Sequence, residues 1–197
     1  MHRIWVSEGL VLGKRGVGEA HVAIFVLTQE YGLLRAVARS ARLDKSKLRY
    51  GLEPLTRARF SFVRGRHEWR LVGVEHALRL LLAQPASGRR MAGQLMRLLL
   101  RLIHGEEPLP ALYRVVSEGL FELARLHEVL EGAEYAQAVE CVLVLRVLAC
   151  LGYVPSRVEL MPFIEEGPFS AELAAQAQAA RPLLVRVINE SLSVTGL

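Results

Sequence analysis

The chain has 197 residues, 52% of them hydrophobic, which suffices for one sizeable core or two small ones and excludes wholesale disorder. Its net charge of +5 is unevenly distributed: residues 1–80 hold 15 Lys or Arg and 7 acids (+8), whereas residues 81–197 hold 10 and 13 (−3). Such a basic first part favours a polyanionic partner, either nucleic acid or an anionic membrane surface.

Short strands separated by glycine-containing turns are predicted in the first 80 residues, because apolar and polar side chains alternate there with a period of two. The longest gap, Arg42–Pro54, separates the third strand from the fourth. A five-stranded barrel with an insertion at that position is typical of an OB-fold. The predicted strands are Ile4–Leu12, Ala20–Thr28, Leu33–Ala41, Thr56–Val63 and His67–Val74.

From about Leu78 the hydrophobic period changes to 3.6 residues, which predicts helices. The chain is therefore expected to be an α+β protein with an OB-fold nucleic-acid-binding domain over residues 1–79 and an all-α domain over residues 80–197. The third helix is apolar almost all round and should form the centre of the bundle. The predicted helices are an amphipathic segment around Met91–Ile103, Pro110–Leu130, Ala133–Leu151, and a last helix that begins at the N-cap Ser170 and is broken or kinked at Pro182.

Positive side chains gather on one predicted side of the barrel. Strand alternation turns the arginines of the third and fourth strands away from the core, and the long connection adds further cations. Arg64, Arg66 and Arg70, around the last hairpin, are expected to extend this surface. The residues expected to contact the phosphates of a nucleic acid are Arg35, Arg39, Arg42, Lys45, Lys47, Arg49, Arg57 and Arg59.

No base-reading motif accompanies these cations, so binding should depend on the phosphate backbone, show little sequence preference and weaken strongly with salt. Tyr50 could stack on a base, although the sequence favours a packing role for it. A run of charge can also be ordinary solvated surface, and on its own this segment fits that interpretation equally well.

Catalysis and metal binding are not indicated. Gly13–His21 resembles a phosphate-binding loop but is followed by an apolar strand, which favours a hairpin turn. The histidines lack ligand spacing, and no nucleophile has a recognisable base motif, so we expect neither a cofactor nor an enzyme. Without an export signal or a run long enough to span a bilayer, the protein is expected to be cytoplasmic and nucleoid-associated.

Several segments together resemble the RecO family of bacterial recombination mediators. They are T-x-E-Y-G-L from Thr28, followed by a basic strand, K-S-K-L-R from Lys45, G-L-E-P from Gly51, L-G-Y-V-P from Leu151, and I-N-E-S-L-S-V-T-G-L at the C-terminus. The N-terminal segments are the most specific. In combination they are not expected in an unrelated OB-fold.

The resemblance implies an N-terminal OB-fold, a helical C-terminal domain, and binding of single- and double-stranded DNA without sequence specificity. It also implies annealing of complementary strands. The implied partners are RecR and the single-stranded-DNA-binding protein, on whose DNA complexes a recombinase is loaded. The family's DNA surface falls on the same eight residues that the charge distribution selects.

The region after Leu151–Pro155 departs from the family pattern. Many members carry a four-cysteine zinc-binding insertion there, whereas Ser156–Phe169 contains no cysteine, so this is expected to be a zinc-free, shortened member. The acidic, apolar tail of the single-stranded-DNA-binding protein needs cations beside an apolar groove. We place its site on the helical domain near Arg90, Arg97 and Arg101, although these could equally be ordinary surface residues.

Two other classes of function remain open from the sequence. In a non-catalytic adaptor, the helices would bind proteins and the barrel would serve only as a scaffold. In an RNA-binding OB module, the same cations would contact RNA, and no residue here indicates a reader of the 2′-hydroxyl group.

Overall fold

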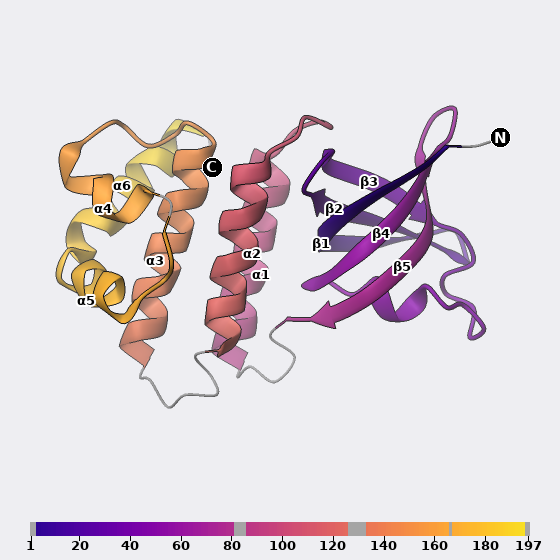
Figure 1. Ribbon diagram of the computed structural model, residues 1–197, viewed down its shortest axis with the longest axis horizontal. Coiled ribbons are helices and arrows are strands. Elements are labelled where there is room, and N and C mark those ends of the chain that lie inside the picture. Colours follow the sequence, from indigo (N-terminus) through magenta and orange to yellow (C-terminus); the bar gives the residue numbers. More distant parts are fainter. Residues whose placement is uncertain (1–2, 81–85, 126–132, 166, 196–197) are drawn as a thin grey trace. The chain divides into compact units, whose positions relative to one another are not determined.

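The computed structural model describes residues 3–80, 86–125, 133–165 and 167–195. The chain forms two compact units: Met1–Leu82 with Ala92–Tyr113, and Ala83–Met91 with Arg114–Leu197. Figure 1 shows the strands and helices of each unit. Separate domains over residues 1–79 and 80–197 stay a prediction.

Five strands form a closed barrel in the first unit (Figure 1). The strand order around the barrel is β1-β2-β3-β5-β4, and every neighbouring pair is antiparallel except β3 and β5. The predicted OB-type barrel, followed by helices, is therefore confirmed. The strands are β1 Ile4–Val17, β2 His21–Thr28, β3 Gly32–Ala38, β4 Thr56–Arg64 and β5 Trp69–Arg79.

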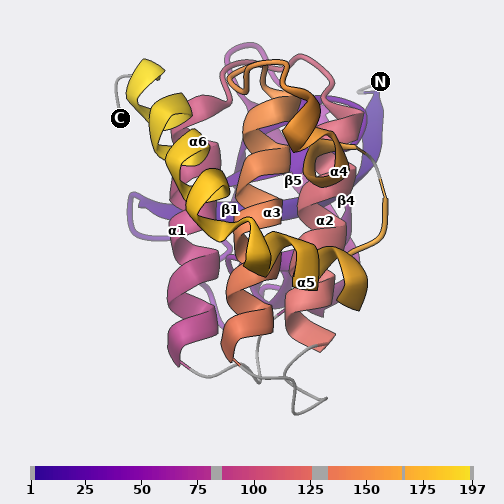
Figure 2. The ribbon, with the colours of Figure 1, turned by 90° about the vertical axis from the view of Figure 1, so that its left-hand side faces the viewer.

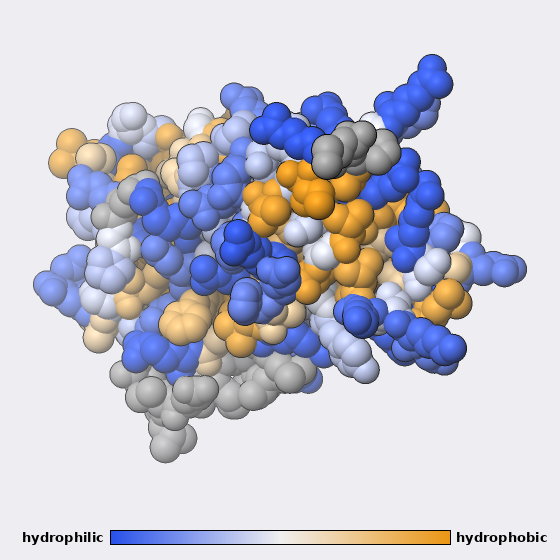
Figure 3. All heavy atoms as spheres, turned by 45° about the vertical axis from the view of Figure 1, so that its right-hand side comes forward, coloured by the Kyte–Doolittle hydropathy of each residue, from blue (hydrophilic) through white to orange (hydrophobic). Residues whose placement is uncertain are grey.

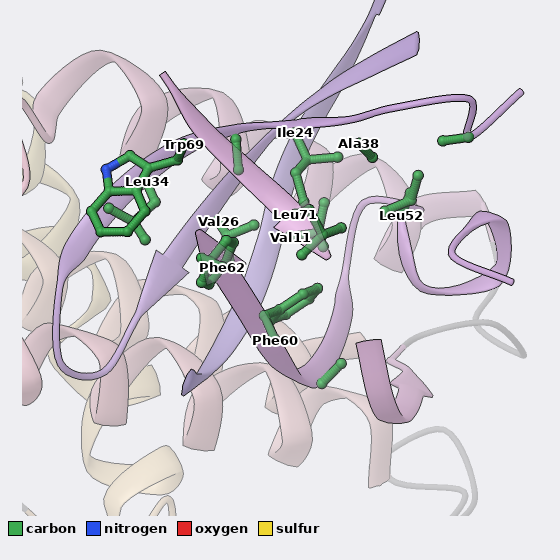
Figure 4. Packing of buried hydrophobic residues seen from close by; sticks show 13 residues of the cluster. Val11, Ile24, Val26, Leu34, Ala38, Leu52, Phe60, Phe62, Trp69 and Leu71 are labelled. Carbon is green, nitrogen blue, oxygen red and sulfur yellow. The ribbon is translucent and has the colours of Figure 1, made fainter. Parts of the chain in front are cut away.

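Alternate residues of the strands fill the barrel. Phe60 and Phe62 of β4 are fully buried and stack with ring centroids 5.9 Å apart. Figure 4 shows these rings beside the side chains that β1, β2, β3 and β5 contribute to the same core. Ala58, Phe60 and Phe62 point inward, so the residues that alternate with them along β4 point outward. Arg57 and Arg59 are among these, as the sequence predicts.

The first strand is longer than the sequence predicts. We expected it to end at Leu12 and a turn to begin at Gly13, whereas β1 continues to Val17 and the turn occupies 18–20. Residues Gly13–Val17 pair with Phe25–His21 of β2 after a register shift between Val11 and Gly13. This ladder of cross-strand hydrogen bonds outweighs the turn preference of the glycines.

The helices of the structure are α1 Ala86–Leu102, α2 Pro110–Arg125, α3 Ala133–Cys150, α4 Met161–Ile164, α5 Ala171–Ala179 and α6 Arg181–Val194, with 3₁₀ turns η1 Arg49–Gly51 and η2 Val158–Leu160. The predicted extension of the second helix to Leu130 lies outside the described residues. Ser170 is the N-cap of α5, since its hydroxyl accepts a hydrogen bond from the Leu173 N–H at 3.1 Å.

Helix α3 is the centre of the helical unit, as predicted. It packs against α4, α5 and α6, and Figure 2 shows α5 and α6 lying across it. On α2, Gly119 allows a close approach, because a Cβ atom there would lie 2.5 Å from Leu143 Cδ1 of α3. Among the described residues, no helix is long and apolar enough to cross a membrane.

Candidate nucleic-acid interface

The loop 39–55, between β3 and β4, carries most of the predicted DNA-binding residues. Two of its apolar side chains, Ala41 and Leu52, belong to the barrel core, and Leu48 packs against that core. Figure 4 shows Leu52 in this position, close to Ala38 at the end of β3. The loop therefore covers one end of the barrel with its apolar side chains and leaves its charged side chains in solvent.

Both ends of this loop are fixed to the barrel. At the first end, Ser40 N–H donates to His21 Nδ1 at 2.9 Å, and Arg42 N–H donates to the Ala20 carbonyl at 3.1 Å. At the second end, Leu55 N–H donates to the Val11 carbonyl at 2.8 Å. Cations between these anchors are thus presented from a backbone that is held in place, which reduces the entropy lost on binding.

All eight residues predicted to bind DNA are exposed to solvent. They lie on three consecutive parts of the chain: β3, the loop 39–55, and the start of β4. Strands β3 and β4 both neighbour β5 but contact different parts of it, because Ala36–Ala38 pair with Trp69–Leu71 whereas Arg57 and Arg59 pair with Leu78 and Glu75. In chain order the eight are Arg35 on β3, Arg39, Arg42, Lys45, Lys47 and Arg49 in the loop, and Arg57 and Arg59 on β4.

Of these eight, one forms an ion pair within the described part of the chain. Arg49 Nη1 lies 3.0 Å from Asp44 Oδ1, and both side chains are well exposed. A surface ion pair of this kind contributes little free energy, so Arg49 can exchange Asp44 for a phosphate at low cost. Arg42 Nη1 donates to the Gly18 carbonyl at a long 3.4 Å, which leaves most of its guanidinium donors available.

The outer face of β4 is less favourable to phosphate than the loop. The strand register places Arg59 between Glu8 of β1 and Glu75 of β5. Exposed Ile4 and Val72 also lie on β1 and β5, and Figure 3 shows an apolar area on the barrel with hydrophilic side chains around it. The positive potential of the eight residues is therefore concentrated in the loop and β3.

The arginines of the last hairpin lie at the other end of β4 from the loop. Arg64 Nη2 is 3.6 Å from Glu106 Oε2, and its guanidinium lies over the Trp69 ring at 5.2 Å. Glu106 also accepts a hydrogen bond from Trp69 Nε1 at 2.8 Å. Arg64 is therefore engaged with Trp69 of β5 and with Glu106 of the connection between α1 and α2, rather than added to the basic loop.

Two cations beside the loop were missed by sequence reasoning. The sequence predicts a turn at Lys14 and Arg15. In the structure these residues belong to the extended β1 and lie at the end of the barrel that the loop covers. Lys14 Nζ forms an ion pair with Glu53 Oε1 at 2.6 Å, which ties β1 to the loop, whereas Arg15 is exposed. No sequence signal marks this, because glycines on both sides of the pair favour a turn.

The three arginines proposed for a protein partner all lie on α1. Arg97 and Arg101 are exposed one turn apart, and Arg90 is exposed two turns before Arg97. A cavity of about 500 Å³ lies elsewhere, in the helical unit, and its lining includes Arg114, Phe121 and Phe169. None of the three proposed arginines lines that cavity.

The residues after Leu151–Pro155 do not fit a zinc site. Ser156–Phe169 contains no cysteine. Cys141 is half-buried and Cys150 is exposed, and they are separated by two and a half turns of α3, so they do not converge. Over the described residues, no three His, Cys, Asp or Glu side chains group in a way that could hold a metal ion.

A closed five-stranded barrel of this strand order defines an OB-type domain, a fold that binds single-stranded nucleic acid in many proteins. Residues 1–75 match the family model described as Recombination protein O N terminal. The match identifies the first unit as a RecO-type N-terminal domain, and it supports a role of the protein in DNA repair and recombination.

Proposed function

We propose that the protein binds single- and double-stranded DNA without sequence specificity, anneals complementary strands, and helps to load a recombinase onto DNA covered by the single-stranded-DNA-binding protein. The observation that carries this proposal is the loop 39–55 of a RecO N-terminal domain, which holds exposed cations on an anchored backbone. Arg35 and Arg57 continue the surface onto the neighbouring strands. Arg59 contributes least, because two acids flank it.

Annealing by this surface requires no bond chemistry. Two DNA strands repel each other through their phosphates, and cations that neutralise both strands allow them to approach. Contacts to the backbone carry no sequence information, so the strands can slide until their bases pair. Flexible side chains such as Lys45 and Lys47 suit this task, since each is a mobile point charge and neither imposes a register.

Binding should weaken steeply as salt rises. If four to six of the cations contact phosphates, affinity for duplex DNA should fall about 10²- to 10³-fold between 50 and 200 mM salt, and somewhat less for a single strand. Fluorescence anisotropy with the full chain and labelled oligonucleotides would measure both slopes. An affinity that stays flat over this range would contradict the proposal.

The proposed protein partners are RecR and the single-stranded-DNA-binding protein. We place the acidic, apolar tail of the latter near Arg90, Arg97 and Arg101 of α1, because the exposed guanidinium groups provide the cations that such a tail requires.

Charge reversal tests this tail site. Arg97→Glu with Arg101→Glu should weaken binding of a tail peptide about tenfold, through lost attraction and added repulsion. Isothermal titration with the full chain would measure the change. The control is Arg157→Glu with Arg186→Glu, which changes the net charge equally at two arginines beside Glu190, the first half-buried and the second exposed on α6. Equal peptide affinity in both variants would place the tail elsewhere.

A further inference from the structure

Tyr50 projects from the basic loop into solvent. Its side chain is 81% exposed, although it lies between the cation Arg49 and the buried Gly51. The packing role that the sequence favours for Tyr50 is therefore wrong. An aromatic ring this exposed buries little apolar surface against the barrel core, so it is free to contact a ligand bound to the loop.

The backbone around Tyr50 is fixed, which determines where the ring points. Residues 49–51 form the 3₁₀ turn η1, closed by a hydrogen bond from Gly51 N–H to the Leu48 carbonyl at 3.0 Å. Gly51 packs against β5 so closely that a Cβ atom would lie 2.3 Å from Val74 Cγ1. With Leu52 buried in the core as well, the turn is clamped on the barrel and presents the ring outward.

This arrangement combines the two features that bind single-stranded nucleic acid. The cations of the loop attract the phosphates, and a flat ring among them offers a surface on which an unpaired base can stack. In duplex DNA the bases are already stacked on each other and paired, so the ring has no free base face to contact. A ring at this position should therefore favour single strands over duplexes.

We propose that Tyr50 stacks on an unpaired base of single-stranded DNA and gives the basic loop its preference for single strands over duplexes. This inference rests on the proposed DNA binding by the loop. It adds stacking on a base to the phosphate contacts of the cations. One stacked base changes affinity by about 5- to 150-fold when the aromatic side chain is cut to alanine, and an open surface site lies at the lower end of that range.

The test compares Tyr50→Ala with Tyr50→Phe in the full chain, by anisotropy at one salt concentration. Tyr50→Ala should weaken binding of an oligo-dT strand at least about fivefold and change duplex affinity less than twofold. Tyr50→Phe should bind as the unaltered chain does, because the ring is kept. The dependence of affinity on salt should be the same in all three, since no cation is changed.

Two controls separate stacking from other effects of the substitution. Leu43→Ala removes another exposed apolar side chain, 54% exposed, from the same loop and should leave binding unchanged. A strand of abasic residues keeps the phosphates without the bases, so Tyr50→Ala should not alter its affinity. Together these controls assign any loss to contact between the ring and a base.

The outcomes also distinguish this inference from the proposed function. If the unaltered chain binds DNA with a steep salt dependence, but Tyr50→Ala lowers single-strand affinity less than twofold or lowers duplex affinity equally, stacking by Tyr50 is wrong and phosphate binding by the loop stands. If the unaltered chain binds neither form of DNA, the proposed function and this inference both fail.

Discussion

Reversing two charges in the loop, Lys45→Glu with Lys47→Glu, should reduce the affinity of the full chain for single-stranded and duplex DNA at least about a hundredfold at moderate salt. Each replacement removes a phosphate contact and places a carboxylate where the DNA backbone would lie. Both lysines are exposed, and neither forms an ion pair within the described residues, so the substitutions leave the barrel core intact. Salt-titrated anisotropy would measure the loss, and the remaining slope should be shallower.

The same variant distinguishes a DNA-annealing protein from an adaptor. It should fail to anneal complementary oligonucleotides while keeping the proposed binding to RecR and to the tail peptide. Arg157→Glu with Arg186→Glu, which changes the net charge by the same amount, should anneal normally. If the unaltered chain does not anneal strands, or the lysine variant anneals at the same rate, the basic loop has no part in annealing. Competition between DNA and RNA strands of equal length would then test the RNA-binding alternative.

The sequence predicts the barrel well, because alternation over short segments reports which side chains face the core. Arg35 and Arg57 lie on the outer face as alternation requires, and the long gap before β4 became the loop that covers the barrel. All eight expected cations are exposed. Alternation depends only on neighbouring residues, which is why it can be read without the structure.

What the sequence could not predict depends on cross-strand register and on packing at a distance. The acids Glu8 and Glu75 beside Arg59 come from strands far from it in sequence, and only the register of the sheet brings them together. The exposure of Tyr50 depends on how η1 packs against Val74 of β5. The intrinsic preferences of the residue types indicate neither the acids beside Arg59 nor the exposure of Tyr50. Tyrosine, for example, is found both in cores and on binding surfaces.

The helical unit holds a further residue whose role the sequence did not indicate. Arg146 interrupts the apolar run of α3, and its side chain is buried among α3, α4 and the segment that follows α4. Its Nε donates to the Phe163 carbonyl at 3.0 Å, its Nη1 donates to the Gly167 carbonyl at 2.6 Å, and its guanidinium lies over the Phe169 ring at 4.8 Å. One guanidinium thus holds Phe163, Gly167 and Phe169, all in the second half of Ser156–Phe169, against α3.

Burial of this guanidinium has an electrostatic cost. Desolvation lowers the pKa of Arg146 from its usual range, and the negative charge of Glu118 opposes that shift. Two hydrogen bonds to main-chain carbonyls offset this cost: the bond to Phe163 is buried and the bond to Gly167 is half-buried. Lysine could not replace arginine here, since a single ammonium group does not span two acceptors in the way that the planar guanidinium does.

Arg146→Ala should therefore lower the free energy of unfolding by about 3 kcal/mol. Two hydrogen bonds from a charged donor and the packing on Phe169 are lost together, and the desolvation cost that is removed offsets part of this loss. Urea unfolding of the full chain, followed by far-UV circular dichroism, would measure the change.

Arg186→Ala, on an exposed face of α6, should change stability by less than about 1 kcal/mol. The folded Arg146→Ala protein should bind DNA as before, since the basic loop lies in the other unit. An Arg146→Met variant as stable as the unaltered chain would show instead that desolvation offsets the hydrogen bonds, and that packing alone holds the segment.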